Sequence, residues 1–266
     1  MMHTAPNPRI IGAVNWLGLW TLYRKEVRRF LKVIFQTVGA PVVTTLLFFA
    51  VFALALGGIV RTTAAVPYLE FLAPGLVMMA MAQNAFANTS SSVIIAKVQG
   101  NIVDVLMPPL SALELTVGYV AGGVTRGVLV GAVTLVAMVP FAGLTVHDPV
   151  FILYHAIMAS ALLSMLGVIG GIWAEKFDHI AAVTNFVVTP LTFLSGTFYT
   201  VDRLPETFWW LAHFNPFFYM IDGFRYGFIG HSDGTLLIGL AVMAAVNLAL
   251  GFLTYRMFQS GYKLKA

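Results

Sequence analysis

The sequence has no cysteine and few charged residues. The absence of cysteine from all 266 residues excludes disulfide bonds, zinc sites with thiolate ligands and cysteine nucleophiles. Asp, Glu, Lys and Arg make up 10% of the chain, whereas a soluble domain carries about 25%. So few charges cannot cover the surface of a soluble fold of this size. The composition therefore excludes a cytosolic enzyme and a nucleic-acid-binding protein, although the isoelectric point of 9.4 is basic.

Apolar residues are abundant instead. Hydrophobic residues make up 59% of the chain, and the mean hydropathy is +0.87. The 21 Phe, 9 Tyr and 5 Trp residues also exclude a disordered chain, because disordered chains contain few aromatic residues. This composition predicts an integral membrane protein.

Six stretches are apolar and long enough to cross a bilayer, which takes about 20 residues for a helix. They cover approximately residues 35–58, 71–95, 115–142, 150–173, 180–199 and 235–258. Each is a continuous apolar run, unlike the alternating ten-residue segments of a membrane barrel. We therefore predict an all-α membrane protein with six transmembrane helices in a single domain over residues 1–266.

The positions of the basic residues predict the orientation, because cytoplasmic loops are enriched in Lys and Arg. The opposite side of the membrane receives only Arg61, Arg203 and Arg225. Eleven of the fifteen basic residues fall on one side of the predicted spans: Arg9, Arg24, Lys25, Arg28, Arg29, Lys32, Lys97, Lys176, Arg256, Lys263 and Lys265. Both termini are therefore predicted to be cytoplasmic.

Residues 12–34, ahead of the first span, predict an amphipathic interfacial helix. Its apolar face carries Trp16, Leu19, Trp20, Tyr23, Val27, Phe30, Leu31 and Ile34, and its basic face carries Arg24, Lys25, Arg28, Arg29 and Lys32. Such a helix lies in the headgroup layer, with its tryptophans inserted and its cations facing anionic lipid. It either anchors the chain or contacts a cytoplasmic partner. No small-residue cleavage site follows it, which argues against a signal peptide.

Ionisable and catalytic groups are scarce in the spans. All eleven Asp and Glu residues are expected in loops or at span edges, so ion-coupled transport lacks a buried carboxylate. Arg126 is expected to snorkel, and His155 to lie near the headgroups. The sequence has no HExxH, GxSxG or GxxxxGK[ST] motif. We therefore predict that the chain is not an enzyme, binds no cofactor or metal, and depends on another chain for any ATP hydrolysis.

Glycines at four-residue spacing mark the third and fourth spans. Gly118, Gly122, Gly123, Gly127 and Gly131 lie in the third, and Gly167 and Gly171 in the fourth. Small residues at this spacing allow membrane helices to approach closely. The pattern predicts helix packing and no chemistry.

The cytoplasmic loop over residues 97–109 predicts a short amphipathic helix from Asn101 to Met107. Pro108 and Pro109 cannot continue a helix, so it must end there. The apolar side chains of this helix suit a small docking surface for another protein. Alternatively, the helix packs against the bundle or the headgroups.

The external segment over residues 200–230 is too apolar for an aqueous loop, yet its charges and Asn215-Pro216 prevent a clean span. We predict a re-entrant pair of half-helices that divides at Asn215-Pro216 and is buried in protein or lines a cavity. Asp222 and Arg225 are three residues apart, so they are expected to form an ion pair. The many aromatic residues here also favour an outer interfacial belt.

The end of the sequence resembles a known family. Pro190, the run Phe193-Leu194-Ser195-Gly196-Thr197-Phe198-Tyr199, Leu204-Pro205, Asn215-Pro216-Phe217-Phe218-Tyr219, Asp222 and Arg225 resemble the C-terminal signature of type-2 ATP-binding cassette permeases. The likeness is to the bacterial drug, polysaccharide and nodulation-factor exporters. Length, six spans, the interfacial helix and the segment before the last span agree as well.

The resemblance implies a homodimer of permease chains in the bacterial inner membrane, with two cytoplasmic ATPase subunits that bind ATP and Mg. In such a permease, spans two and five line the route between the two permease chains. The resemblance assigns coupling to the ATPase to Asn101, Asp104, Leu106, Met107, Arg28 and Arg29. It assigns the transport pathway to Gln83, Asn84, Asn88, Phe193 and Phe198. It assigns the external gate to Asn215, Pro216, Asp222 and Arg225.

Two alternatives to an ATP-driven permease stay open at this stage. A carrier or channel that works without an ATPase is compatible with the absence of a nucleotide site. A membrane enzyme or scaffold acting on lipids would need paired catalytic groups at one depth, and the sequence offers none. The cargo is predicted to be amphiphilic, lipid-like or a glycan.

Overall fold

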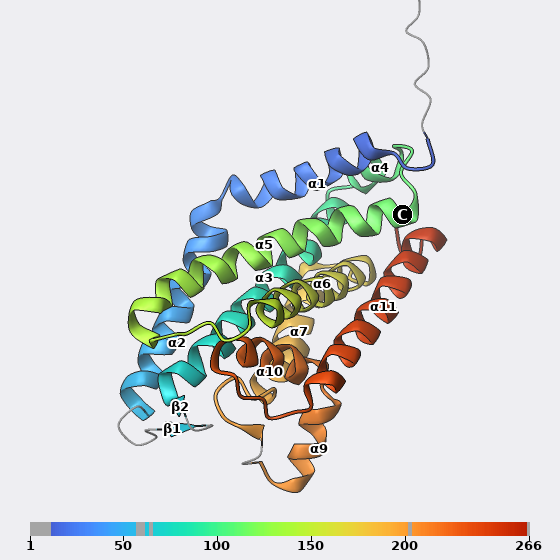
Figure 1. The fold of residues 1–266 in the computed structure, drawn as a ribbon. Helices are drawn as coiled ribbons and strands as arrows, with labels where there is room; N and C mark the ends of the chain where they lie inside the picture. Colours follow the sequence, from blue (N-terminus) through green and yellow to red (C-terminus); the bar gives the residue numbers. More distant parts are fainter. Residues whose placement is uncertain (1–11, 57–61, 64–65, 202–203, 265–266) are drawn as a thin grey trace, which may run out of the picture.

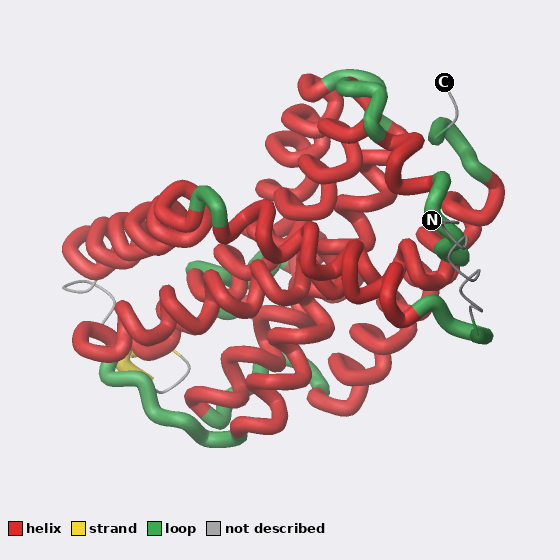
Figure 2. The backbone as a smooth tube through the Cα atoms, turned by 90° about the horizontal axis from the view of Figure 1, so that it is seen from above, coloured by secondary structure: helices red, strands yellow, loops and turns green. Residues whose placement is uncertain are grey.

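The computed structural model describes residues 12–56, 62–63, 66–201 and 204–264, and this part of the chain is almost entirely helical (Figures 1 and 2). Six helical segments in it are long and apolar enough to cross a membrane: Phe35–Ala55, Tyr68–Val98, Ala112–Ala142, Pro149–Trp173, Phe177–Leu194 and Leu236–Ser260. The predicted fold class is confirmed. The predicted end of the first span at 57–58, residues 202–203 of the external segment, and Arg9, Arg61, Arg203 and Lys265 lie outside the described residues.

The spans are built from α-helices and two π-helical segments. The first half of the chain forms α1 (Trp16–Leu31), η1 (Phe35–Gly39), α2 (Ala40–Leu56), β1 (Thr62–Thr63), β2 (Val66–Pro67), α3 (Tyr68–Val98), α4 (Ile102–Leu106) and α5 (Ala112–Ala142). The second half forms α6 (Pro149–Trp173), α7 (Phe177–Val183), η2 (Thr184–Val188), α8 (Thr189–Leu194), α9 (Glu206–Phe214), α10 (Pro216–Ile229) and α11 (Leu236–Ser260). The two strands pair antiparallel as a short hairpin.

Helix α3 is the centre of the bundle. Of its most apolar stretch, 83% is buried, and it packs against α5, α6, α10 and α2. It is also the least hydropathic of the six spans found in the described residues. The hydroxyls of Thr89, Ser90 and Ser91 bond to carbonyls one turn earlier or to α6. A polar helix is placed inside because its side chains find protein partners there and none in lipid.

The glycines of α5 and α6 are packing contacts, as predicted. A Cβ atom at Gly118 would lie 2.6 Å from Leu22 of α1, and one at Gly122 would lie 2.5 Å from the Cβ of Glu26. Gly127 faces Ser160 of α6 and the backbone of α3, and Gly171 faces Val93 of α3. The absence of side chains at these positions therefore allows three spans and α1 to approach closely.

The fifth span starts earlier and ends earlier than predicted. Its helix runs from Phe177 to Leu194, not to Tyr199. Gly196 has a φ angle of +77°, which ends the helix, and its carbonyl accepts a bond from Arg225. Arg225 therefore stabilises the non-helical segment that follows α8.

The molecule has two distinct ends. Helices α1 and α4 and the C-terminal end of α11 lie at one end, and the β-hairpin and α9 lie at the other (Figure 1). The first end carries Lys25, Arg28, Lys97, Arg256 and Lys263. The segments predicted to be cytoplasmic therefore lie together.

Candidate functional site

The loop after α3 forms the predicted short helix, α4, with one buried and one exposed face. Ile102 is buried in a cluster with Leu22 of α1 and Leu115 of α5, and Leu106 packs against the same cluster. Val103, Asp104 and Met107 are exposed, and the Met107 side chain is 78% exposed. Of the predicted coupling residues, Leu106 therefore belongs to the inner face of α4. Val103, which the sequence did not predict as a coupling residue, lies on the exposed face.

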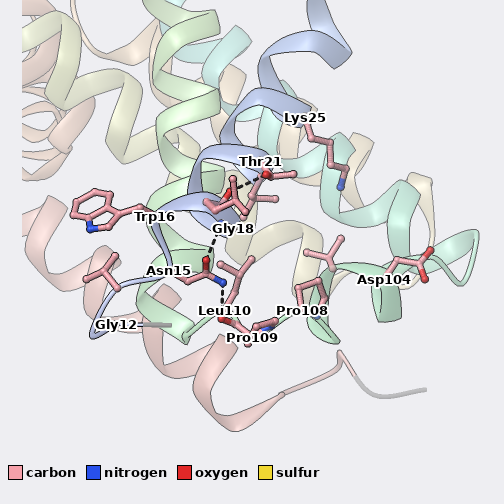
Figure 3. A pocket seen from close by; sticks show the side chains of 14 residues that line it. Gly12, Asn15, Trp16, Gly18, Thr21, Lys25, Asp104, Pro108, Pro109 and Leu110 are labelled. Atoms are coloured by element: carbon pink, nitrogen blue, oxygen red, sulfur yellow. Dashed lines mark hydrogen bonds between the residues drawn. The ribbon is translucent and has the colours of Figure 1, made fainter. Parts of the chain in front are cut away.

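A groove of about 580 Å³ separates α4 from the start of α1 (Figure 3). Asn15 joins its two walls: the side-chain Nδ2 donates to the Pro109 carbonyl at 3.0 Å, and Oδ1 accepts from the Gly18 amide at 2.9 Å. The backbone amide of Asn15 donates to Glu114, which also caps the start of α5 at Ser111. The positions of α1, α4 and α5 are therefore fixed relative to one another at this end.

Helix α1 contacts the bundle through a face that the periodic pattern of its sequence did not assign. Leu22, Glu26 and Phe30 are its buried residues, whereas Trp16 is 72% exposed and Trp20 is also exposed. The reason is the shape of α5, where Gly118 and Gly122 leave a depression that Leu22 and Glu26 fill. Packing against this depression turns the tryptophans away from the bundle.

A buried charge cluster joins α1 to α3, and sequence reasoning missed it. The Glu26 carboxylate is completely buried; it accepts from Ser92 at 2.7 Å and pairs with Arg29 at 3.4 Å. Arg29 also donates to the Asn88 backbone at 2.5 Å and side chain at 2.9 Å. Arg29 therefore bonds to the bundle through its guanidinium while its side chain stays partly exposed, and its predicted coupling role stays a prediction. Arg28 is exposed.

The three polar residues predicted for the pathway on α3 differ in accessibility. Asn88 is completely buried beneath Arg29, and Asn84 is buried and accepts a bond from Arg126 at 2.9 Å. Both bond to arginine side chains of their own chain, and their place on a transport route stays a prediction. Gln83 is half-buried and stays accessible. The bond to Asn84 also corrects the prediction that Arg126 snorkels to the headgroups.

His155 lies inside the bundle, near the start of α6, and its depth near the headgroups stays a prediction. Its ring is 1% exposed, Nδ1 contacts the Phe151 carbonyl at 2.9 Å, and Nε2 has no hydrogen-bond partner among the described residues. Gly223 of α10 faces the ring so closely that no side chain fits there. His155 therefore sets the distance between α6 and α10.

The external segment divides where the sequence predicts. Helix α9 ends at Phe214, Asn215 is extended, and α10 begins at Pro216. The Asn215 Oδ1 accepts from the Phe217 amide, and its Nδ2 donates to the Leu191 carbonyl at 3.0 Å and to Ser195 at 2.8 Å. Asn215 thus starts α10 and ties it to α8.

Asp222 and Arg225 do not pair with each other, contrary to the prediction. Asp222 accepts from Ser232 at 2.6 Å and from the amides of Asp233 and Gly234, in the turn before α11. Arg225 donates to the Phe71 and Gly196 carbonyls and stacks on the Phe71 ring at 3.8 Å. Both are buried. The two side chains point in different directions. Asp222 therefore bonds to the turn before α11, and Arg225 bonds to α3 and to the segment after α8.

Phe193 and Phe198 form part of an aromatic stack, and the sequence did not reveal its third member. The Phe198 ring lies 5.4 Å from Phe193 and 4.5 Å from Phe52 of α2. The stack connects the C-terminal parts of α2 and α8. Phe193 is exposed and Phe198 is half-buried, so part of this apolar surface is accessible.

An electrostatic contact holds the residues that follow α11 at the end of α6. Lys263 pairs with Glu175 at 2.8 Å, which lowers the pKa of Glu175 and raises the pKa of Lys263. Lys97 donates to the carbonyls of Ile172 and Ala174 at the end of α6, where the negative end of the helix dipole favours a cation. Among the described residues, no group of three His, Asp or Glu side chains could hold a metal ion.

The fold is that of a multi-pass helical membrane protein with an amphipathic helix ahead of the first span, a short helix in the loop after the second span and a divided helix before the last span. Residues 18–229 match the family of ABC-2 type transporters, and the chain belongs to that family. It is 37% identical to the inner membrane transport permease YadH of Escherichia coli over 251 residues, 94% of this chain and 98% of YadH. It is 25% identical to nodulation protein J of Rhizobium leguminosarum bv. trifolii, over 83% of each chain.

Proposed function

We propose that the chain is the permease subunit of an ATP-binding cassette exporter in the bacterial inner membrane. Its function is to move an amphiphilic, lipid-like or glycan substrate, with the energy supplied by two separate ATPase subunits that bind ATP and Mg. The observation that carries the proposal is membership of the ABC-2 type transporter family together with the 37% identity to YadH over nearly the whole chain.

The proposed contact with the ATPase is the outer face of α4. Val103, Asp104 and Met107 are exposed on a helix whose inner face, through Ile102, is fixed to α1 and α5. A force on α4 therefore reaches the spans through packed side chains. ATP binding acts by shifting the population of bundle conformations, because the closed ATPase pair contacts one conformation more favourably than the other.

The proposed pathway lies between two copies of the permease. The accessible members of the predicted set are Gln83, Phe193 and Phe198, and Phe52 joins them in the aromatic stack. Asn215, Pro216, Asp222 and Arg225 hold the external segment in place, so their proposed contribution to the gate is to position α9 and α10. An apolar, aromatic surface with few charges suits an amphiphilic substrate.

The test is a double substitution on the outer face of α4, Val103→Asp with Met107→Asp. Neither side chain is needed for the inner packing of α4, so the chain should insert and fold normally. We expect co-purification of the cassette ATPase from native membranes to fall about tenfold or more, the effect of losing two central interface residues. ATP-dependent transport into inverted vesicles should fall in parallel.

The control is Tyr262→Asp, which adds one of these carboxylates at an exposed position of the same end. Tyr262→Asp should leave ATPase binding unchanged. Unchanged ATPase binding and transport in the α4 variant would overturn the assignment of α4. Transport by the purified chain in vesicles without any ATPase would contradict the proposed function and support an ATPase-independent carrier or channel.

A further inference from the structure

The central helix α3 keeps one accessible stripe. Residues 71–96 are all described, and those that are not buried lie at a spacing of four: Gln83, Ala87, Ser91 and Ile95. Side chains four residues apart lie on one side of a helix, so they form a single surface, the α3 stripe. Since Gln83 belongs to the proposed pathway, we expect the rest of the α3 stripe to face it as well.

Two arginines bond to α3 beside this stripe. Arg29 of α1 donates from Nη1 to the Ser91 hydroxyl at 3.1 Å, and Arg126 of α5 donates from Nη2 to Asn84, the neighbour of Gln83, at 2.9 Å. Both arginines are partly exposed, and their like charges act unfavourably on each other. The accessible side of α3 is therefore flanked by positive charge.

Only the first of these charges is neutralised within the fold. Glu26 pairs with Arg29 at 3.4 Å. Within the described part of the chain, Arg126 bonds to Asn84 but to no carboxylate, and its buried Nε has no hydrogen-bond partner. A guanidinium has five N–H donors, whereas one neutral donor would be enough to bond to Asn84. The packing of α5 against α3 therefore does not account for the charge of Arg126.

The position of Arg126 along its span makes this charge more unusual. Arg126 is the fifteenth of the 31 residues of α5, so it lies about 21 Å along a helix about 45 Å long. That is near the middle of the membrane, far from the layer where lipid headgroups lie. A charge at this depth is costly without a partner, and such residues characteristically mark the pathways of substrates or ions.

We propose that Arg126 binds an anionic group of the cargo, a phosphate or a carboxylate, on its way through the membrane. The flat guanidinium can donate two parallel hydrogen bonds to such a group, and the Gln83 amide offers a further donor. The inference rests on the proposed function and deepens it, because it assigns the cargo to the anionic amphiphiles rather than to neutral glycans.

A single thiol on the α3 stripe measures the local potential, because the chain has no cysteine of its own. Ala87→Cys, in the full chain in phosphatidylcholine nanodiscs, is modified with anionic sulfonatoethyl or cationic trimethylammonioethyl methanethiosulfonate. The ratio of the anionic to the cationic rate should fall about threefold or more when Arg126→Gln is added, because loss of the positive charge disfavours anions and favours cations nearby. An unchanged ratio, or no reaction with either reagent, would overturn the inference.

Two controls separate the charge of Arg126 from other effects. Arg24→Gln removes an exposed charge of α1 and should leave the ratio unchanged. Asn84→Ala removes the bond between α5 and α3 but keeps the guanidinium, so it should also preserve the ratio. A decrease in Asn84→Ala as large as that in Arg126→Gln would show that Arg126 acts only by holding the helices together, and would overturn the inference.

Dodecyl phosphate tests the ligand class. It should slow the modification of Ala87→Cys, whereas dodecanol, with the same chain and no charge, should not. The dissociation constant obtained from this protection should rise about tenfold or more in Arg126→Gln, as expected for lost hydrogen bonds to a charged group. Arg126→Lys should lie between, because it keeps the charge but loses the paired donors. Equal protection by dodecanol, or an unchanged constant in Arg126→Gln, would contradict the site.

An anionic lipid is the other possible source of such a group. Replacing part of the phosphatidylcholine by phosphatidylglycerol should not protect Ala87→Cys when dodecyl phosphate is absent. Protection by phosphatidylglycerol alone would show that a lipid headgroup occupies the site and would overturn its assignment to the cargo.

The inference and the proposed function fail separately. If dodecyl phosphate gives no protection while the wild-type chain still co-purifies with a cassette ATPase, the anion site is wrong and the proposed function stands. If the chain transports without an ATPase but protection depends on Arg126, the proposed function is wrong and the anion site stands.

Discussion

Single buried side chains decide how the helices of this protein meet. Glu26 illustrates this at the α1 end, because one carboxylate bonds to Ser92 of α3 and pairs with Arg29, which in turn bonds to Asn88. A buried charge is tolerated only when it is paired and hydrogen-bonded. Glu26 therefore stabilises α1 against the bundle only as long as its partners are present.

We expect Glu26→Ala to lower the free energy of unfolding by about 3 kcal/mol, the lower end of the range for breaking a buried pair, because Arg29 remains partly exposed. That corresponds to a decrease in melting temperature of about 6–12 °C for a chain of this size. Thermal unfolding in detergent measures it. Lys25→Ala is the control, since Lys25 is exposed and 3.8 Å from the same carboxylate; an equal decrease in both variants would contradict the special role of Glu26.

At the scale of elements, the divided helix α9–α10 depends on one residue at its break. Asn215 caps α10 with its Oδ1 and ties the break to the end of α8 with its Nδ2. Pro216 at the first position of α10 has no amide hydrogen to satisfy, so it suits the start of a helix. The break is therefore held in one place by complementary local and tertiary contacts.

Two substitutions at Asn215 separate these contacts. Asn215→Ser keeps an oxygen that can cap α10 but loses the bonds to Leu191 and Ser195, whereas Asn215→Ala loses both. We expect Asn215→Ala to be less stable than Asn215→Ser by about 1 kcal/mol, the usual contribution of an N-cap. Hydrogen exchange of the Phe217 and Phe218 amides should increase more in Asn215→Ala. Equal exchange in the two variants would show that the cap contributes nothing.

At the scale of the whole molecule, the exposed basic residues gather at one end of the helix bundle. The exposed basic residues of α1, Lys97 in the last turn of α3 and Lys263 after α11 belong to segments at the end of the molecule that carries α4 (Figure 1). The excess of Lys and Arg on cytoplasmic loops therefore predicts that this end faces the cytoplasm. Helix α9 then lies on the external side.

Single cysteines test this orientation. Tyr262→Cys after α11 should react with a membrane-impermeant maleimide only after the cells are permeabilised, whereas Glu206→Cys at the start of α9 should react in intact cells. Both native side chains are exposed and lie outside the proposed ATPase contact, so accessibility does not limit either reaction. Labelling of Tyr262→Cys alone in intact cells would reverse the orientation.

Sequence reasoning was most accurate where the deciding interaction is local. Hydropathy located the six spans, the two prolines after Met107 ended α4, and Asn215-Pro216 divided α9 from α10. The sequence pattern failed where a neighbour decides the outcome. Asp222 and Arg225 have the spacing of an ion pair, but loop amides before α11 and carbonyls of α3 and residue 196 offered each a better-placed partner.

The sequence by itself determined that this is a six-span helical membrane protein, because hydropathy and helix length are properties of each segment alone. Only the tertiary structure decided which face of each helix is buried. The apolar stripe of α1 predicted the face that carries its tryptophans, whereas the depression at Gly118 and Gly122, which accepts Leu22 and Glu26, decided the face that packs against the bundle. Close packing depends on the shapes of both partners, and a periodic pattern describes only one of them.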